Sequence, residues 1–212
     1  MENPVIIFGA NYLGRSAKEI FEGNNNVVYG FLDDNKALHN KEIDTATVLG
    51  STDDDGFLKL IGKKCEAFVA VDDNKLRKNL VKMIQEVRHV QPTNAIHKDS
   101  RIAGSASIGY GNFFDVGAIV SAGAVVKNHC ILHPNVVVGA ESEVGDFVQI
   151  GAGSIINPGV VIEDEAFIGS GVVIVSGITI GKGARIGAGS VVIAPVKSGE
   201  TVFGNPAEKV NA

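Results

Sequence analysis

The stretch from Val144 to Val192 reads VGDFVQIGAGSIINPGVVIEDEAFIGSGVVIVSGITIGKGARIGAGSVV and decides the fold of the second half of the chain. An aliphatic or aromatic residue recurs there at every sixth position, and the spacing continues without a break over sixteen positions. A period of six fits neither the α-helical repeat nor the two-residue alternation of an amphipathic strand. It fits a solenoid of short strands and tight turns, in which three six-residue units form one triangular coil. The positions are Ile102, Ile108, Phe114, Val120, Val126, Leu132, Val138, Val144, Ile150, Ile156, Ile162, Ile168, Ile174, Ile180, Ile186 and Val192.

Small residues occupy two further positions of the repeat. Glycine often follows the aliphatic residue, and a small or β-branched residue such as Ala118, Ala166 or Ser190 lies four positions after it. We expect the aliphatic side chain to point inward and the small one to sit where the backbone bends around it. So many Gly and β-branched residues would cost several kcal/mol in a helix of this length. The flat faces of such a solenoid stay exposed, which favours association between copies.

The glycines also locate a domain boundary. Of the 26 glycines in 212 residues, seventeen lie between residues 100 and 192, so the composition changes near Pro92. We therefore predict two domains, residues 1–91 and residues 92–212.

The first domain begins with a pattern typical of nucleotide-binding βαβ units. An apolar run over 5–8 leads into a turn from Gly9 to Gly14, a helical pattern over 15–21 and a second strand over 27–32 that ends at Asp33 and Asp34. Rossmann-like units place nucleotide-binding groups at such positions. Gly9, Asn11, Asp33 and Asp34 are therefore the candidate nucleotide-binding residues. The turn lacks the central glycine of GxGxxG, which disfavours a dinucleotide, and a purely structural turn is the alternative.

The sequence of the rest of this domain predicts a small parallel sheet with flanking helices. Residues 67–71 form a buried strand, and residues 74–87 form an amphipathic helix. The acidic run 53–55 is expected to cap a helix that begins near Gly56 and Phe57. The apolar face of the predicted 74–87 helix comprises Leu76, Leu80, Met83, Ile84 and Val87.

Charge and composition exclude several classes of function. The chain has 19 Lys and Arg against 24 Asp and Glu, a net charge of −5, and no basic block, so nucleic acid is not an expected partner. The start lacks a basic signal-peptide region, and no apolar run approaches the roughly 20 residues of a membrane span. We expect a cytoplasmic protein without a membrane partner. Cys65 and Cys130 are expected to be buried small hydrophobes, and no metal site is predicted.

The whole chain resembles the sugar O-acyltransferase family, which includes sialic acid O-acetyltransferases and N-acetyltransferases of nucleotide-linked amino sugars. The resemblance rests on five segments, at 7–14, 31–34, 96–97, 144–148 and 202–207. It implies a Rossmann-like domain followed by a left-handed parallel β-helix of hexapeptide repeats, and a homotrimer. It also implies that Asp33 and Asp34 hold the base of a nucleotide sugar.

The resemblance further implies an acetyl-CoA site in a groove between two subunits. Backbone groups near Gly151, Gly169 and Ala188 would line the pantetheine arm. The basic residue after the closing Asn-Pro-Ala would approach the CoA phosphates. In this chain that residue is Lys209, one position later than in the family.

The catalytic positions depart from the family pattern. Family members commonly carry a histidine beside an acidic residue just before the Ile-Gly-Asp turn, and here that histidine position is Ala140. A second family histidine is replaced by Gln149, which we group with the acetyl-CoA-binding residues, and an asparagine by His133. Our candidate catalytic residues are Glu141 and His133, with a surface carboxylate and a solvated turn histidine as the alternatives. His129 is interpreted as structural.

The resulting functional hypothesis is acetyl transfer from acetyl-CoA to a nucleotide-linked amino sugar in surface-glycan synthesis. Sugar O-acetylation is an alternative. It depends more strongly on a catalytic base than N-acetylation does, because a sugar hydroxyl is far less acidic than an ammonium group. A second alternative is a catalytically impaired homologue that binds the nucleotide sugar and CoA. A dehydrogenase or epimerase is disfavoured because the chain lacks GxGxxG and a Tyr-Lys pair.

Overall fold

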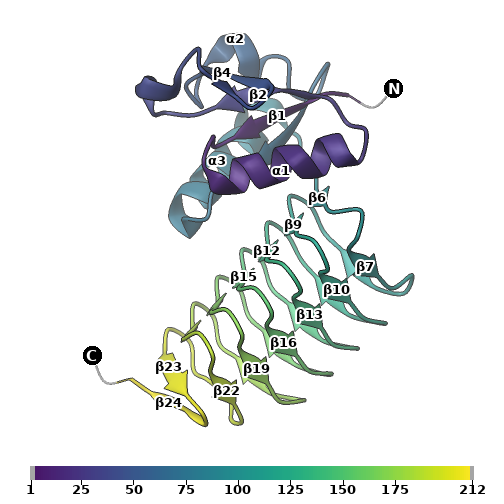
Figure 1. Ribbon diagram of the computed structural model, residues 1–212. Helices are drawn as coiled ribbons and strands as arrows, with labels where there is room; N and C mark the ends of the chain where they lie inside the picture. Colours follow the sequence, from purple (N-terminus) through teal and green to yellow (C-terminus); the bar gives the residue numbers. More distant parts are fainter. Residues whose placement is uncertain (1–2, 211–212) are drawn as a thin grey trace. The chain divides into compact units, whose positions relative to one another are not determined.

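The computed structural model describes residues 3–210, which divide by their packing into two units between Lys98 and Asp99. The first unit carries the helices and a five-stranded sheet, and the second carries short strands stacked in regular succession (Figure 1). No helix among the described residues is both long and apolar enough to cross a membrane.

The first unit is an α/β domain. Its sheet has the strand order β3-β4-β2-β1-β5, in which β4, β2, β1 and β5 run parallel, as predicted. Strand β3 runs antiparallel to β4, which the sequence analysis did not anticipate. Asp44 adopts φ 54° in the short connection, a conformation that Asp tolerates in hairpin turns. The elements are β1 (Val5–Phe8), α1 (Tyr12–Gly23), β2 (Val28–Leu32), η1 (Lys36–Leu38), β3 (Glu42–Ile43), β4 (Ala46–Gly50), α2 (Asp55–Leu58), β5 (Glu66–Val69), α3 (Asn74–Arg88) and β6 (Ala95–Ile96).

All three α-helices begin at side-chain caps, and two of the caps bear on the predictions. Asn11 Oδ1 accepts hydrogen bonds from the backbone N–H groups of Leu13 and Gly14, so α1 starts before the expected Arg15. Asp54 accepts from the N–H of Gly56 at 2.7 Å and caps α2, as the acidic run predicted. These caps stabilise the first turns because they satisfy donors that have no partner within the helix.

Helix α3 confirms the predicted span but corrects its buried face. Leu80, Val81 and Ile84 are buried, whereas Leu76 and Val87 are exposed. Two buried residues were not predicted, Val81 and Arg77, and Arg77 Nη1 donates to the carbonyls of Val71 at 2.7 Å and Asp72 at 3.1 Å. A guanidinium that finds backbone acceptors replaces an apolar residue here, and an apolar pattern cannot reveal this.

The second unit is a parallel β-helix with three faces. The first face is formed by β7, β10, β13, β16, β19 and β22, the second by β8, β11, β14, β17 and β20, and the third by β9, β12, β15, β18, β21 and β23. Strand β24 pairs antiparallel with β23. The elements are β7 (Arg101–Ile102), β8 (Ser107–Ile108), β9 (Phe113–Phe114), β10 (Ile119–Val120), β11 (Val125–Val126), β12 (Ile131–Leu132), β13 (Val137–Val138), β14 (Glu143–Val144), β15 (Gln149–Ile150), β16 (Ile155–Ile156), β17 (Val161–Ile162), β18 (Phe167–Ile168), β19 (Val173–Ile174), β20 (Thr179–Ile180), β21 (Arg185–Ile186), β22 (Val191–Val192), β23 (Thr201–Gly204) and β24 (Ala207–Lys209).

The aliphatic or aromatic residue that recurs every six positions is the second residue of each short strand. The fourteen positions from Phe114 to Val192 are all buried, and each coil pairs with the next in register eighteen residues on. Ile102 and Ile108 are less buried because the first coil has a neighbouring coil of the β-helix on one side only. The small residues of the turns are buried too, and so are both cysteines, as predicted.

Three edges join the faces, and each is a column of turns. The glycine edge joins the third face to the first and comprises 115–118, 133–136, 151–154, 169–172 and 187–190. The Glu141 edge joins the first face to the second and comprises 103–106, 121–124, 139–142, 157–160 and 175–178. The charged edge joins the second face to the third and comprises 109–112, 127–130, 145–148, 163–166 and 181–184.

Candidate functional site

The turn after β1 is shaped by two glycines. Gly9 adopts φ 107°, and a Cβ on Gly14 would lie 2.0 Å from the carbonyl oxygen of Gly9. The GxxxxG spacing therefore serves close packing of the turn on the start of α1. It leaves the backbone after β1 at the carboxyl edge of the parallel strands, where α/β folds bind ligands.

The acidic pair after β2 lies next to this turn, as the sequence predicted. Asp33 Oδ2 accepts from the backbone N–H of Ala10 at 2.8 Å, which ties the ends of β1 and β2 together. Asp34 is exposed, and its Oδ1 accepts from both the N–H and the hydroxyl of Thr52, each at 2.9 Å. The structure thus brings Gly9, Asn11 and Asp33 together, while Asp34 is directed toward the loop after β4.

A second polar pair at the same edge of the sheet was missed by the sequence analysis. The Tyr12 hydroxyl donates to Asp72 Oδ2 at 2.9 Å, linking the first turn of α1 to the loop after β5. Burial and the Asp72 carboxylate raise the pKa of Tyr12 to about 12. The signal in the sequence was that Asp72 and Asp73 follow a buried strand, just as Asp33 and Asp34 do.

In the β-helix, the predicted residues His133, Gln149, Gly151, Gly169 and Ala188 are distributed over successive coils on or beside the glycine edge. His133, Gly151 and Gly169 occupy the same position in successive turns of the glycine edge. The Nε2 atoms of His133 and Gln149 are 3.3 Å apart.

Below His133 the glycine edge has almost no side chains. A Cβ on Gly151 would lie 2.4 Å from the backbone nitrogen of Ser170, and one on Gly169 would lie 2.5 Å from that of Ala188. Glycine is therefore required by the close approach of successive coils. The turns 151–153, 169–171 and 187–189 read Gly-Ala-Gly, Gly-Ser-Gly and Gly-Ala-Gly, so the edge presents mainly backbone.

Two other predicted site residues lie elsewhere in the chain. Glu141 is exposed, with φ 57°, on the Glu141 edge, across the first face from His133. Lys209 Nζ lies 3.4 Å from Glu200 Oε1. Both residues are at the end of the third face that borders the charged edge, opposite to the glycine edge. The hydrogen bond from the backbone N–H of Lys197 is the largest cause of the lowered pKa of Glu200, and Lys209 contributes to it. Within one chain, neither Glu141 nor Lys209 reaches the His133–Gln149 pair.

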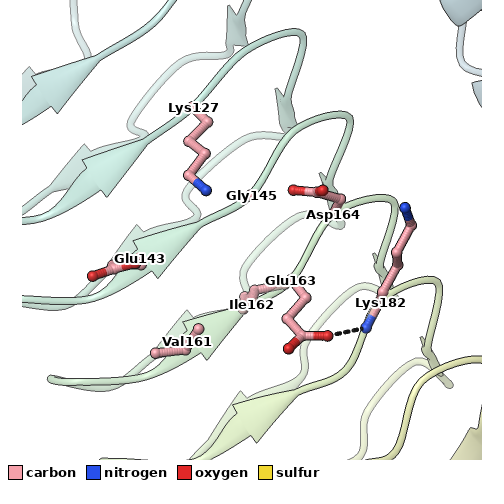
Figure 2. A pocket seen from close by; sticks show the side chains of 8 residues that line it. All are labelled: Lys127, Glu143, Gly145, Val161, Ile162, Glu163, Asp164 and Lys182. Carbon is pink, nitrogen blue, oxygen red and sulfur yellow. Dashed lines mark hydrogen bonds between the residues drawn. The ribbon is translucent and has the colours of Figure 1, made fainter.

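The charged edge holds a hollow of about 330 Å³ with charges of both signs. Lys127, Asp164 and Lys182 line this region from three turns of the charged edge, and Glu163 accepts from the backbone N–H of Lys182 at 2.7 Å (Figure 2). The residues lining it are Lys127, Glu143, Gly145, Val161, Ile162, Glu163, Asp164 and Lys182. No group of His, Cys, Asp and Glu side chains suited to a metal ion occurs among residues 3–210.

His129, on the charged edge, is buried and structural, as expected. Its ring stacks on Phe147 with the centroids 4.8 Å apart, and its backbone N–H donates to the carbonyl of Tyr110. The ring also fills the space beside Gly111, where a Cβ would lie 2.2 Å from His129 Nδ1.

Each of the two units matches a known protein family. Residues 4–84 match the family described as PglD N-terminal domain. Residues 141–176 and 159–194 match the family described as bacterial transferase hexapeptide (six repeats). No curated protein gives a significant match to the chain.

Solved structures resemble the chain over its whole length. A mutant of perosamine N-acetyltransferase from Caulobacter crescentus, in complex with CoA and GDP-perosamine, has a TM-score of 0.91 at 24% identity and covers 100% of this chain and 99% of its own. The acetyltransferase domain of PglB from Neisseria gonorrhoeae has a TM-score of 0.90 at 27% identity, with 99% and 100% covered. WeeI from Acinetobacter baumannii has a TM-score of 0.86 at 23% identity, with 98% and 99% covered. These likenesses confirm the predicted fold, a Rossmann-like α/β domain followed by a left-handed parallel β-helix.

Proposed function

We propose that this chain, a member of the hexapeptide-repeat sugar acyltransferases, transfers the acetyl group of acetyl-CoA to the amino group of a nucleotide-linked sugar. The observation that carries the proposal is the His133–Gln149 pair next to the part of the glycine edge, from residue 151 on, that has almost no side chains. Acyl transfer from CoA requires a base, and it requires a surface with few side chains along which the long pantetheine arm can lie. Perosamine N-acetyltransferase, similar over the full length, was solved with CoA and a nucleotide amino sugar.

We place acetyl-CoA along the glycine edge, with its thioester near His133. Successive coils are spaced by about 4.8 Å, so the turns at 151, 169 and 187 extend about 14 Å beyond His133. The pantetheine arm between sulfur and pyrophosphate has about thirteen bonds and spans about 15 Å when extended, taking the advance per bond of an extended backbone. The arm therefore matches the three glycine turns, and Gly151, Gly169 and Ala188 would line it.

The nucleotide is placed at the carboxyl edge of the first unit's sheet. Asn11 Oδ1 is occupied by the α1 cap, which leaves the amide N–H₂ of Asn11 to donate to a ligand. Asp33 and Asp34 would accept hydrogen bonds from N–H groups of the base. The Gly9 turn allows close approach of the backbone.

Association into a homotrimer would complete the catalytic site. The outward residues of the first face form an aliphatic column, in which Ile119 and Ile155 are exposed. This face is bordered on one side by the glycine edge and on the other by the Glu141 edge. If three first faces surround a threefold axis, each glycine edge meets the Glu141 edge of the next copy. The column is Ile119, Val137, Ile155, Val173 and Val191.

In this arrangement His133 acts as the base. The amine nitrogen attacks the thioester carbon, the new C–N bond forms, and the C–S bond breaks. The proton of the amine passes to His133 and then to the CoA thiolate, which leaves as the thiol. Gln149 holds the imidazole, because its amide can donate to the neutral ring and, after rotation, accept from the protonated ring. Glu141 of the next copy would stabilise the imidazolium.

The test is an acetylation assay with acetyl-CoA and a panel of UDP-, dTDP- and GDP-linked 4-amino sugars. We expect thiol release that depends on one of these acceptors, and a product heavier by one acetyl group in mass spectrometry. Absence of acetyl-CoA binding and of thiol release with every acceptor would contradict the proposal. We place the reaction in the cytoplasm, in the synthesis of a surface glycan.

Ala140 favours a second candidate, a homologue that binds both ligands without turnover. The family's histidine position is Ala140, whose side chain cannot carry a proton. Ala140→His distinguishes the two: a large gain of activity from a silent protein would support impairment, whereas little change in an active protein would support His133. O-acetylation is tested in the same assay with acceptors that carry a hydroxyl in place of the amine.

A further inference from the structure

The column of turns that begins at His133 ends in an aromatic side chain. The parallel pairing of β21 with β23 sets Ile186 opposite Val202, so Phe203 follows Gly187 in the column. A Cβ on Gly187 would lie 2.4 Å from Phe203 Cδ2, which shows that the ring lies directly against the glycine edge. The column therefore runs from His133 through three glycines to Phe203.

The backbone next to Phe203 is anchored, and much of the Phe203 ring is open to solvent. The backbone N–H of the next residue, Gly204, donates to the hydroxyl of Ser190 at 3.1 Å, which attaches the β23–β24 hairpin to the last turn of the glycine edge. The exposed fraction of Phe203 is 58%. An aromatic ring on an anchored backbone is suited to stacking on a planar ligand, since a Phe side chain has few rotatable bonds and loses little conformational entropy on binding.

We propose that Phe203 is the stacking platform for the adenine ring of CoA. This inference rests on the proposed function, which places the thioester at His133. The extended pantetheine arm then brings the pyrophosphate near Gly187, about 15 Å along the edge. The adenosine half continues past that point, and the next level of the column, about 4.8 Å further, is occupied by the Phe203 ring. Phe203 thus recognises the adenine nucleotide half of the donor, while the glycine turns accommodate the arm.

The chain offers a matched control in Tyr110. Its exposed fraction is 59%, and it belongs to the same unit, but it lies on the charged edge. Tyr110 has no place in the proposed acetyl-CoA or nucleotide sites. Tyr110→Ala therefore removes a similarly exposed ring without touching the column.

The experiment compares the binding of CoA with that of 4′-phosphopantetheine, which lacks the adenosine half, by titration calorimetry on the full chain. For Phe203→Ala we expect CoA binding to weaken about 5- to 100-fold, the range found when a ring that stacks on a nucleobase is truncated. The binding of 4′-phosphopantetheine should change by less than about twofold. Phe203→Trp should retain CoA binding, Phe203→Leu should lose it as Ala does, and Tyr110→Ala should change neither ligand.

The contrary outcomes separate this inference from the proposed function. If the native chain binds CoA no more tightly than 4′-phosphopantetheine, or if Phe203→Ala weakens both ligands equally, stacking on Phe203 is overturned while the CoA site stands. If the native chain binds neither ligand, the proposed function fails together with the inference. Thermal unfolding of each variant shows whether the hairpin remains folded, and Phe203→Leu, which keeps most of the apolar bulk, decides the matter if Phe203→Ala unfolds it.

Discussion

The glycine edge and the charged edge share one backbone repeat but differ in chemistry. Both are columns of four-residue turns stacked eighteen residues apart, and both bury the residue at the last turn position, which is small or aliphatic except at Asn112. The glycine edge then presents mainly backbone at 151–153, 169–171 and 187–189. The charged edge presents Asn128, Asp146, Asp164 and Lys182 at one position of successive turns. The inward positions specify the fold, and the outward turn positions are free to carry different functions.

The largest effect that this comparison predicts is on catalysis. His133→Asn on the glycine edge should lower kcat/KM for acetyl transfer by about 10²- to 10⁴-fold, the usual contribution of a general base. Glu163→Gln on the charged edge should leave kcat/KM unchanged. Initial rates of thiol release measure both variants, and CoA binding should persist in each. Equal losses in the two variants would remove the functional distinction between the edges.

The second effect concerns the close stacking of coils at the glycine edge. Gly169→Ala would set a Cβ 2.5 Å from the backbone nitrogen of Ala188, so we expect a loss of about 3 kcal/mol in the unfolding free energy, the upper part of the range for overpacking. Gly104→Ala is the matched control, because a Cβ there meets nothing within 4 Å. Chemical denaturation followed by circular dichroism measures both. A Gly169→Ala protein as stable as Gly104→Ala would show that the edge has room for side chains.

The sequence predicted the repeating part of the fold well, because inward positions repeat and the period is visible in one chain. It predicted less of the site. The six-residue period sets His133 and Glu141 in consecutive turns of one coil, and therefore on different edges, but it does not reveal which edges of two copies meet. In the first unit, Tyr12 and Asp72 are sixty residues apart and meet only because β5 lies beside β1. The buried Arg77 was missed because its partners are the backbone carbonyls of Val71 and Asp72 and the amide oxygen of Asn74, none of which produces an apolar pattern in the sequence.

A third prediction tests what the polar residues of the charged edge contribute. Asp146 Oδ1 accepts from the backbone N–H and the side-chain amide of Asn128, each at 2.9 Å, and the Asp146 N–H donates to Asp164 Oδ1 at 2.9 Å. Asp146→Ala should cost about 1–2 kcal/mol of unfolding free energy, since two donors lose a partly buried acceptor. Asp146→Asn keeps an acceptor oxygen and should cost less than about 0.5 kcal/mol. If both variants cost the same, the negative charge rather than the hydrogen bonds stabilises this edge.

The smallest effect is expected from the ion pair of the same edge. Lys182 Nζ lies 3.6 Å from Glu165 Oε1, and the Lys182 side chain is largely exposed. Exposed pairs of this kind contribute little, so Lys182→Met should lower the unfolding free energy by less than about 0.5 kcal/mol, and the difference should vanish in about 1 M NaCl because salt screens exposed charges. Differential scanning calorimetry at low and high salt measures it. A larger loss that persists in salt would mean that the side chain of Lys182 stabilises the edge through packing of its alkyl stem, and the charged edge would then resemble the glycine edge in depending on contacts between coils.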